Sequence, residues 1–101
     1  MEISAATFDK LLKQRTQVNI LDVREVIEFH TYNIGGVNLP LSRLYDNVDN
    51  TGFNKTDEIV VICKAGIRSK TAQAILLQNG YTNVKNLSGG LLAIQRLPQS
   101  L

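Results

Sequence analysis

The fold of this chain is decided by residues 58–69, which read Glu-Ile-Val-Val-Ile-Cys-Lys-Ala-Gly-Ile-Arg-Ser. Four consecutive apolar residues, Ile59 to Ile62, predict a strand that is buried on both faces, as in the middle of a parallel sheet. Cys63, the only cysteine, follows directly. Because open α/β sheets place their functional groups just past the carboxyl ends of such strands, Cys63 stands where a reactive group is expected.

The size and composition of the chain favour one globular domain over residues 1–101. The net charge of +2, with Lys and Arg scattered along the chain, gives no reason to expect a nucleic-acid partner. No apolar stretch approaches the roughly 20 residues that a membrane-spanning helix needs, and the first residues do not resemble a signal peptide. We therefore expect a cytoplasmic protein, a monomer or weak dimer, that does not act at a membrane.

Side chains that could hold a metal ion are scarce in this sequence. The chain has one cysteine and one histidine. A single cysteine cannot form an internal disulfide, and the two side chains together cannot complete an ordinary zinc site. We therefore expect no metal and no cofactor.

The rest of the chain alternates between strand and helix patterns. Helices are expected at residues 5–13, 42–47, 69–79 and 91–97, with a helical turn at 25–29. Strands are expected at 18–23, 59–62 and 84–87, with a short edge strand at Ile3, a brief extended piece at 37–39 and a surface loop over 46–56. Strands that alternate with helices over short connections predict a parallel sheet with helices on both faces.

The residues after Cys63 favour a reactive thiol over an inert one. A lone cysteine at the end of a buried strand is more often a small core side chain than a nucleophile. Here, however, Gly66 lets the segment 64–67 curl so that its backbone N–H groups point inward and bind an anion. The helix predicted next brings its positive N-terminus to the same place, and Lys64 and Arg68 add two cations. Together these features predict a thiolate in an anion-binding cradle.

A cysteine-dependent phosphatase or arsenate reductase is the alternative reaction class. Phosphatase loops of that kind have the pattern Cys-x5-Arg, whereas only four residues separate Cys63 from Arg68. A ring of amides that is one residue smaller fits a single sulfur atom better than a tetrahedral phosphate. Ile62 also stands where these phosphatases usually carry histidine, and the chain has no second cysteine to resolve an intermediate. The spacing therefore argues against phosphate chemistry.

Four motifs resemble those of the rhodanese family, in the same order along the chain. Residues 63–69 are similar to the family's Cys-Arg-x-Gly-x-Arg-Ser loop. Residues 20–25, with 28–29, resemble its Leu-Leu-Asp-Val-Arg-Glu…Glu-Phe segment, and residues 34–40 resemble its Ile-x-Gly-Ala-x-Asn-Ile-Pro turn in a slightly shortened form. Residues 80–90 are similar to its Gly-Phe-x-Asn-Val…Leu-x-Gly-Gly ending. The resemblance extends over nearly the whole chain.

The resemblance implies a rhodanese-like α/β fold, a central parallel sheet of five strands with helices on both faces, and sulfurtransferase chemistry. Cys63 would take the outer sulfur of thiosulfate, or of a protein persulfide, and become a persulfide itself. A nucleophilic acceptor, cyanide in vitro or a thiol or protein in the cell, would then remove that sulfur. The resemblance makes the residues after the cysteine the substrate-binding loop: Lys64, Ala65, Gly66, Ile67, Arg68 and Ser69.

Charged residues near the loop receive roles from the same resemblance. Lys64 and Arg68 would bind the dianionic donor. Family members that act on 3-mercaptopyruvate usually carry threonine in place of Arg68, so the arginine points to thiosulfate or a protein persulfide. Asp22 and Arg24, at the end of the 18–23 strand, are expected to form a structural pair near the loop that supports the site without a direct catalytic role.

The chain departs from the family pattern at a few positions. Lys64 replaces the commoner arginine, which keeps the charge and loses the bidentate geometry. Ile94 stands where a tryptophan is usual. The family often has Gly-His where this chain has residues 32–33, and we expect the nearby His30 to be a surface residue rather than a catalytic base.

A second interpretation of the whole chain is a catalytically idle rhodanese-like module that binds or regulates another protein. Such modules commonly lose the cysteine. This chain keeps Cys63 together with Arg68, which favours the enzyme over the module.

Overall fold

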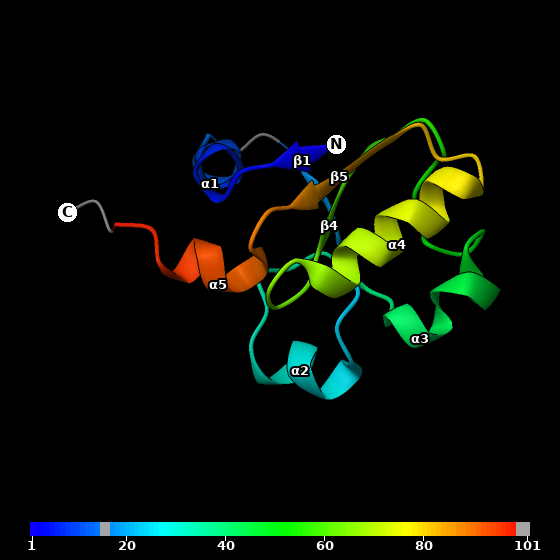
Figure 1. Ribbon diagram of the computed structural model, residues 1–101, viewed down its shortest axis with the longest axis horizontal. Helices are drawn as coiled ribbons and strands as arrows, with labels where there is room; N and C mark the ends of the chain where they lie inside the picture. The colour runs from blue at the N-terminus through cyan, green and yellow to red at the C-terminus, as the bar shows by residue number, and fades with distance from the viewer. Residues whose placement is uncertain (15–16, 99–101) are drawn as a thin grey trace.

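The chain folds into a parallel five-stranded sheet with helices on both sides, as Figure 1 shows. The computed structural model describes residues 1–14 and 17–98. The strands are β1 (Glu2–Ile3), β2 (Asn19–Asp22), β3 (Val37–Asn38), β4 (Glu58–Ile62) and β5 (Asn83–Leu87). The helices are α1 (Ala5–Lys13), α2 (Val26–Thr31), α3 (Leu41–Leu44), the 3-10 turn η1 (Tyr45–Asn47), α4 (Ile67–Gln78) and α5 (Gly90–Gln95). The central parallel sheet of five strands with helices on both faces, expected from the sequence, is confirmed.

Strand β4 is the centre of the sheet, because the strand order is β1-β5-β4-β2-β3. It pairs in parallel with β2 on one side, where Ile62 lies opposite Asp22, and with β5 on the other, where Ile59 lies opposite Val84. The four apolar residues 59–62 are each no more than 1% exposed. The sequence predicted such a strand, because only a central parallel strand hides both of its faces.

Side chains of β4 alternate between two apolar layers. Val61 and Cys63 belong to the layer that packs under α3 and α4, with Leu44 and Leu76. Val60, Ile62 and their neighbours belong to the opposite layer under α1 and α5. Figure 1 shows these two pairs of helices on opposite sides of the sheet. The nucleophile candidate is therefore anchored in the core of the α4 layer.

Two local expectations need correction. Helix α4 begins at Ile67 rather than at Ser69, because Gly66 takes a left-handed conformation (φ 91°) that ends the loop and lets the helix start at once. The segment 46–56 is not wholly a surface loop. Thr51 within it is 1% exposed, and its hydroxyl lies 2.9 Å from the Tyr81 hydroxyl. A buried hydrogen bond thus ties this loop to the turn after α4.

Smaller differences concern the ends of elements. Strand β2 is shorter than the expected 18–23, and α5 starts and ends earlier than the expected 91–97. Among the described residues, 1–14 and 17–98, no helix is both long and apolar enough to cross a bilayer.

Replacing Leu76 with alanine should lower the free energy of unfolding by about 2–5 kcal/mol, because a fully buried side chain leaves a cavity in the α4 layer. Leu77 is the matched control on the same helix, since it is 45% exposed. Leu77→Ala should lower the free energy of unfolding by less than about 1 kcal/mol. Urea unfolding of the two variants measures the difference, and equal losses would show that the assigned core is wrong.

Candidate active-site loop

The sulfur of Cys63 is held inside a tight turn at the carboxyl end of β4. The side chain is 1% exposed. The backbone N–H of Gly66 donates to Sγ at 3.1 Å, and that of Ser69 at 3.3 Å. The hydroxyl Oγ of Ser69 also lies 3.3 Å from Sγ. The inward-facing amides that the sequence predicted are present around the sulfur.

Two neighbouring elements force the loop into this shape. Gly66, with a φ of 91°, reverses the backbone so that its N–H points back to Sγ. On the outside, the N–H groups of Leu91 and Leu92 each donate at 3.0 Å, to the carbonyl oxygens of Cys63 and Lys64 respectively. The start of α5 therefore holds the loop carbonyls outward, which leaves the loop amides facing inward.

This close approach of α5 requires glycine at position 90. A Cβ added to Gly90 would lie 2.5 Å from the carbonyl oxygens of both Cys63 and Lys64. Its φ of 62° is also one that other residues rarely adopt. The Gly-Gly pair at 89–90 thus permits the backbone contact that shapes the loop.

The environment of Cys63 favours the thiolate. Burial raises the pKa of the thiol, but hydrogen bonds outweigh this effect and hold the pKa below its ordinary value. The largest of these hydrogen bonds come from the Ser69 side chain and from the backbone N–H groups of Ser69, Gly66 and Ala65. Directed hydrogen bonds, rather than the two flanking cations, therefore account for most of the stabilisation of the charged sulfur.

Arg68 lies in the first turn of α4 and is paired with a carboxylate. Its two terminal nitrogens contact the Glu28 oxygens at 2.6 and 2.9 Å in a bidentate arrangement. The hydrogen bonds from Arg68 lower the pKa of Glu28 to about 2, and Glu28 in turn raises the pKa of Arg68 above its usual range. Arg68 was expected at the site from the sequence, whereas its partner Glu28, on helix α2, was not.

Asp22 and Arg24 form the structural pair that the sequence predicted. Arg24 Nη2 lies 2.7 Å from Asp22 Oδ2, with the two side chains 6% and 0% exposed. The same guanidinium donates to the carbonyl of Tyr32 at 2.7 Å and to that of Glu28 at 3.4 Å. The Tyr32 carbonyl at the end of α2 has no helical donor, whereas the Glu28 carbonyl also accepts the Tyr32 N–H. The buried pair therefore fixes the C-terminal end of α2 beside the loop, where a cation is favourable.

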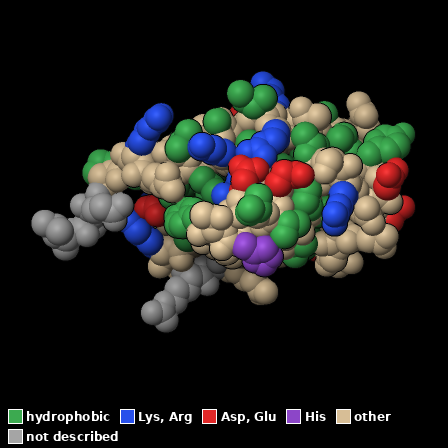
Figure 2. Space-filling model, turned by 90° about the horizontal axis from the view of Figure 1, so that it is seen from below, with side chains coloured by type: hydrophobic (Ala, Val, Ile, Leu, Met, Phe, Trp, Pro, Cys, Tyr) green, Lys and Arg blue, Asp and Glu red, His purple; other side chains and the backbone are tan. Residues whose placement is uncertain are grey.

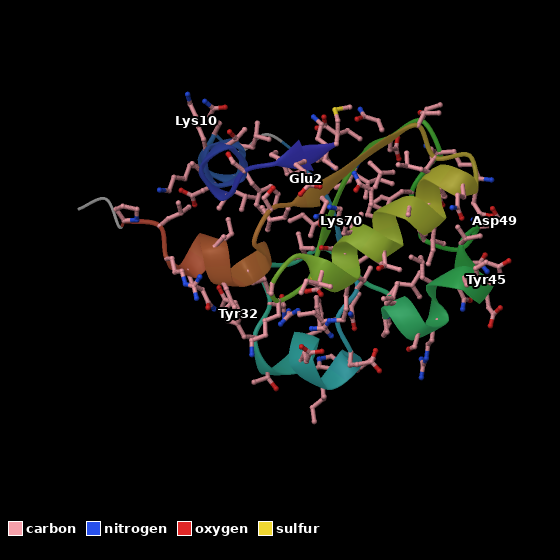
Figure 3. All side chains as sticks on the ribbon, viewed as in Figure 1. Glu2, Lys10, Tyr32, Tyr45, Asp49 and Lys70 are labelled. Carbon is pink, nitrogen blue, oxygen red and sulfur yellow. The ribbon has the colours of Figure 1, made fainter. Side chains whose placement is uncertain are left out.

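A cleft of about 390 Å³ lies between α2, the loop and α5. Arg24, Tyr32, Lys64 and Leu92 are among its lining residues. Tyr32, labelled in Figure 3, comes from the end of α2. Lys64 is exposed, so its ammonium is available to an anion that enters the cleft.

The face that carries α2 mixes charge with apolar surface. Ile27 and Ile67 are each 77% exposed. Figure 2 shows hydrophobic side chains around adjacent acidic and basic groups on this face, with the histidine side chain at the surface nearby. His30 is exposed, as the sequence predicted. Within residues 1–14 and 17–98, no group of three or more His, Cys, Asp or Glu side chains is placed to hold a metal ion.

Asn86 on β5 is a polar residue of the site that sequence reasoning missed. It is 2% exposed and accepts a hydrogen bond from the Ser69 hydroxyl. In the sequence it is one polar residue within a strand pattern, which gives no signal of a functional position. Glu28 did lie within a recognised motif, but a pattern cannot show that it pairs with an arginine that follows much later in the chain.

Comparisons with known proteins agree with this fold. The family model of the rhodanese-like domain matches residues 4–97. The chain is 34% identical over 91 residues to YrkF of Bacillus subtilis, covering 89% of this chain and 48% of that protein, so it spans about half of YrkF. It is 30% identical over 96 residues to a sulfurtransferase of Allochromatium vinosum, covering 94% and 88% of the two chains. The crystal structure of a rhodanese-like domain protein from Staphylococcus aureus has a TM-score of 0.81 and 28% identity, covering 93% and 91%.

The ion pair between Glu28 and Arg68 should make stability depend on pH. The folded-state pKa of Glu28 is about 2 against an ordinary 4.5. The pair therefore contributes its full stabilisation at pH values above the ordinary pKa of glutamate. That contribution is lost as the pH falls toward the pKa of Glu28 in the folded protein. Glu28→Gln should be less stable than the natural chain near neutral pH. The difference in free energy of unfolding, measured with urea at a series of pH values, should narrow on acidification below 4.5.

Arg68→Gln is the matched variant for this experiment, because it removes the other half of the same pair. The difference in free energy of unfolding between Arg68→Gln and the natural chain should also decrease on acidification. A stability difference that stays constant over this pH range would contradict the pairing.

Proposed function

Because this chain belongs to the family of rhodanese-like domains, whose members here include a sulfurtransferase, we propose that Cys63 carries sulfane sulfur as a persulfide between a donor and a nucleophilic acceptor. The observation that supports this most directly is the pair of backbone amides, from Gly66 and Ser69, aimed at Sγ. Such donors stabilise negative charge on sulfur without any need to reorganise.

In the loading step, the Cys63 thiolate attacks the outer sulfur of thiosulfate. A bond forms between Sγ and that sulfur, the S–S bond of the donor breaks, and sulfite leaves with the electron pair. The thiolate is already favoured by the hydrogen bonds of the loop. No general base is therefore required to generate the nucleophile.

In the unloading step, an acceptor such as cyanide or a thiolate attacks the outer sulfur of the persulfide. The bond between the two sulfurs breaks, and its electron pair returns to Sγ. The loop amides again stabilise the thiolate that leaves. Since the chain has no second cysteine, the sulfur passes to another molecule rather than to a second thiol of this chain.

The surroundings of Cys63 limit which donors can react. Sγ belongs to a side chain that is only 1% exposed, so a donor has to present its sulfur on a small or protruding group. Thiosulfate is small, and a persulfide on a protein side chain protrudes. Lys64 is exposed and can bind the anionic end of such a donor, whereas Arg68 shares its charge with Glu28. We propose that Lys64 and Arg68 together bind the donor, with Glu28 moderating the positive charge.

Incubation with thiosulfate should add the mass of one sulfur atom to the protein, and cyanide should then remove it. The adduct should be absent from Cys63→Ala. Intact-protein mass spectrometry before and after each addition measures both steps. Cys63 is the only cysteine. A sulfur adduct that forms on the natural chain but not on Cys63→Ala is therefore carried by Cys63.

Other outcomes would point to the other function classes. A protein that gains no sulfur from thiosulfate or from a protein persulfide is better explained as an idle regulatory module. An adduct that persists in Cys63→Ala would contradict the role of this residue. Hydrolysis of a phosphate monoester with no sulfur adduct would favour the phosphatase.

Replacing Arg68 with alanine should raise the KM for thiosulfate by roughly ten- to a hundredfold, because a charge-assisted contact to the donor is worth about 1.5–3 kcal/mol. The KM for cyanide should change much less. Glu28→Gln is the matched variant, and its effect on the KM for thiosulfate should be opposite. It leaves the Arg68 charge unpaired, so the KM for thiosulfate should fall. Steady-state kinetics with both substrates measures these constants, and an unchanged KM in Arg68→Ala would show that its charge does not bind the donor.

A further inference from the structure

A short series of buried polar side chains leads from the Cys63 sulfur into the sheet. Ser69 Oγ lies 3.3 Å from Sγ and donates a short hydrogen bond to Asn86 Oδ1. Ser69 is fully buried, and Asn86, on β5, is 2% exposed. Burial excludes water as an alternative partner, so these groups have to satisfy one another.

The orientation of the Asn86 amide is fixed by its other neighbours. Its Nδ2 lies 3.1 Å from Glu2 Oε1 and 3.3 Å from the carbonyl oxygen of Gly66. Both of these oxygens are acceptors, so rotating the amide by half a turn would set its own oxygen against them. The amide oxygen therefore faces Ser69 and takes the hydroxyl proton.

The protonation state of Cys63 decides whether all three groups are satisfied. A serine hydroxyl has a single proton. When Cys63 is a thiol, its S–H donates to Ser69 Oγ while the hydroxyl donates to Asn86. When Cys63 is a thiolate, the sulfur can only accept. It already accepts from the Gly66 and Ser69 amides, and the hydroxyl proton can add a third bond to Sγ only by leaving Asn86 Oδ1.

We propose that Asn86 is a positioning residue that competes with Cys63 for the hydroxyl proton of Ser69. The Ser69 hydroxyl turns toward Sγ while that sulfur carries the charge, and toward Asn86 when the charge has moved away. This competition exists in the resting protein, and only its consequence for turnover rests on the proposed function.

During sulfur transfer, the Ser69 hydroxyl would rotate between Sγ and Asn86 as the negative charge on Sγ changes. As the Sγ electron pair forms the new S–S bond, the negative charge passes to the outer sulfur, and the hydroxyl returns to Asn86. When the acceptor removes that sulfur, the electron pair returns to Sγ and the hydroxyl turns back. Asn86 therefore stabilises the loaded state relative to the free thiolate.

Charged groups face this cluster from each element around it. Glu2 on β1 and Lys70 on α4, labelled in Figure 3, line a groove together with Asn86. The others are Lys64 in the loop, Arg68 on α4, Glu28 on α2, and the pair Asp22 and Arg24 at the end of β2. The substitutions below keep all of these charges, but Asn86→Leu also removes the hydrogen bonds from Asn86 to Glu2 and Gly66. The direction of the shift, and its dependence on Ser69, therefore distinguish the effect of the Ser69 proton from the loss of those bonds.

Replacing Asn86 with leucine should lower the pH midpoint of Cys63 alkylation by about half a unit to one unit, because the Ser69 hydroxyl is then free to serve the thiolate. Ser69→Ala should raise the midpoint instead. Iodoacetamide, an uncharged reagent, measures the rate of alkylation as a function of pH. In the Ser69→Ala background, Asn86→Leu should produce no further shift, because no proton remains to compete for.

A purely structural role for Asn86 predicts a different pattern. Loss of its hydrogen bonds to Gly66 and Glu2 would loosen the loop and raise the midpoint. A raised or unchanged midpoint in Asn86→Leu, or an equal fall in the Ser69→Ala background, would therefore overturn the proposal. If the leucine variant does not fold, Asn86→Ala replaces it. Asn86→Ala removes the same amide and should also lower the pH midpoint of Cys63 alkylation. Alkylation uses no sulfur donor, so the result is independent of the persulfide experiment.

Discussion

The left-handed turn at Gly66 is the constraint on which the site depends. It reverses the chain immediately after the central strand, so that β4 and α4 meet almost directly and the Gly66 and Ser69 amides converge on Sγ. A turn of ordinary handedness would point these amides elsewhere and leave a buried thiol with its raised pKa. The fold thus lowers the pKa of a core cysteine through the Ser69 hydroxyl together with backbone amides that the turn directs at the sulfur.

Electrostatic contacts around the turn position α2 more than they bind the sulfur. Arg24 is neutralised by Asp22 and directs its remaining donors to carbonyls at the end of α2. Arg68 reaches the same helix from α4 through Glu28. Two arginines from different elements therefore fix α2 as one wall of the cleft. Because a buried charge without a partner is costly, Asp22 keeps Arg24 in the position from which it holds α2.

The sequence predicted the features that follow from local pattern. The apolar run 59–62 identified the central strand, and Gly66 with Cys63 identified the turn. The expected start of α4 at Ser69 was two residues too late, because the left-handed Gly66 lets the helix begin at Ile67. The Ser69 hydroxyl therefore lies within the first turn, where it contacts Sγ. Glu28 and Asn86 escaped detection for a different reason. Their roles arise from contacts between distant segments, which periodicity along the chain does not record.

The contact between α5 and the loop also has a consequence for biosynthesis. The carbonyls of Cys63 and Lys64 are held by the amides of Leu91 and Leu92, which the ribosome adds much later. A nascent chain that ends before Gly90 already contains the cysteine but lacks the segment that shapes its surroundings. Its thiol would then have the modest reactivity of an ordinary cysteine. The loop around the sulfur therefore takes its final shape only after the Gly-Gly pair at 89–90 and the two residues that follow it have been added.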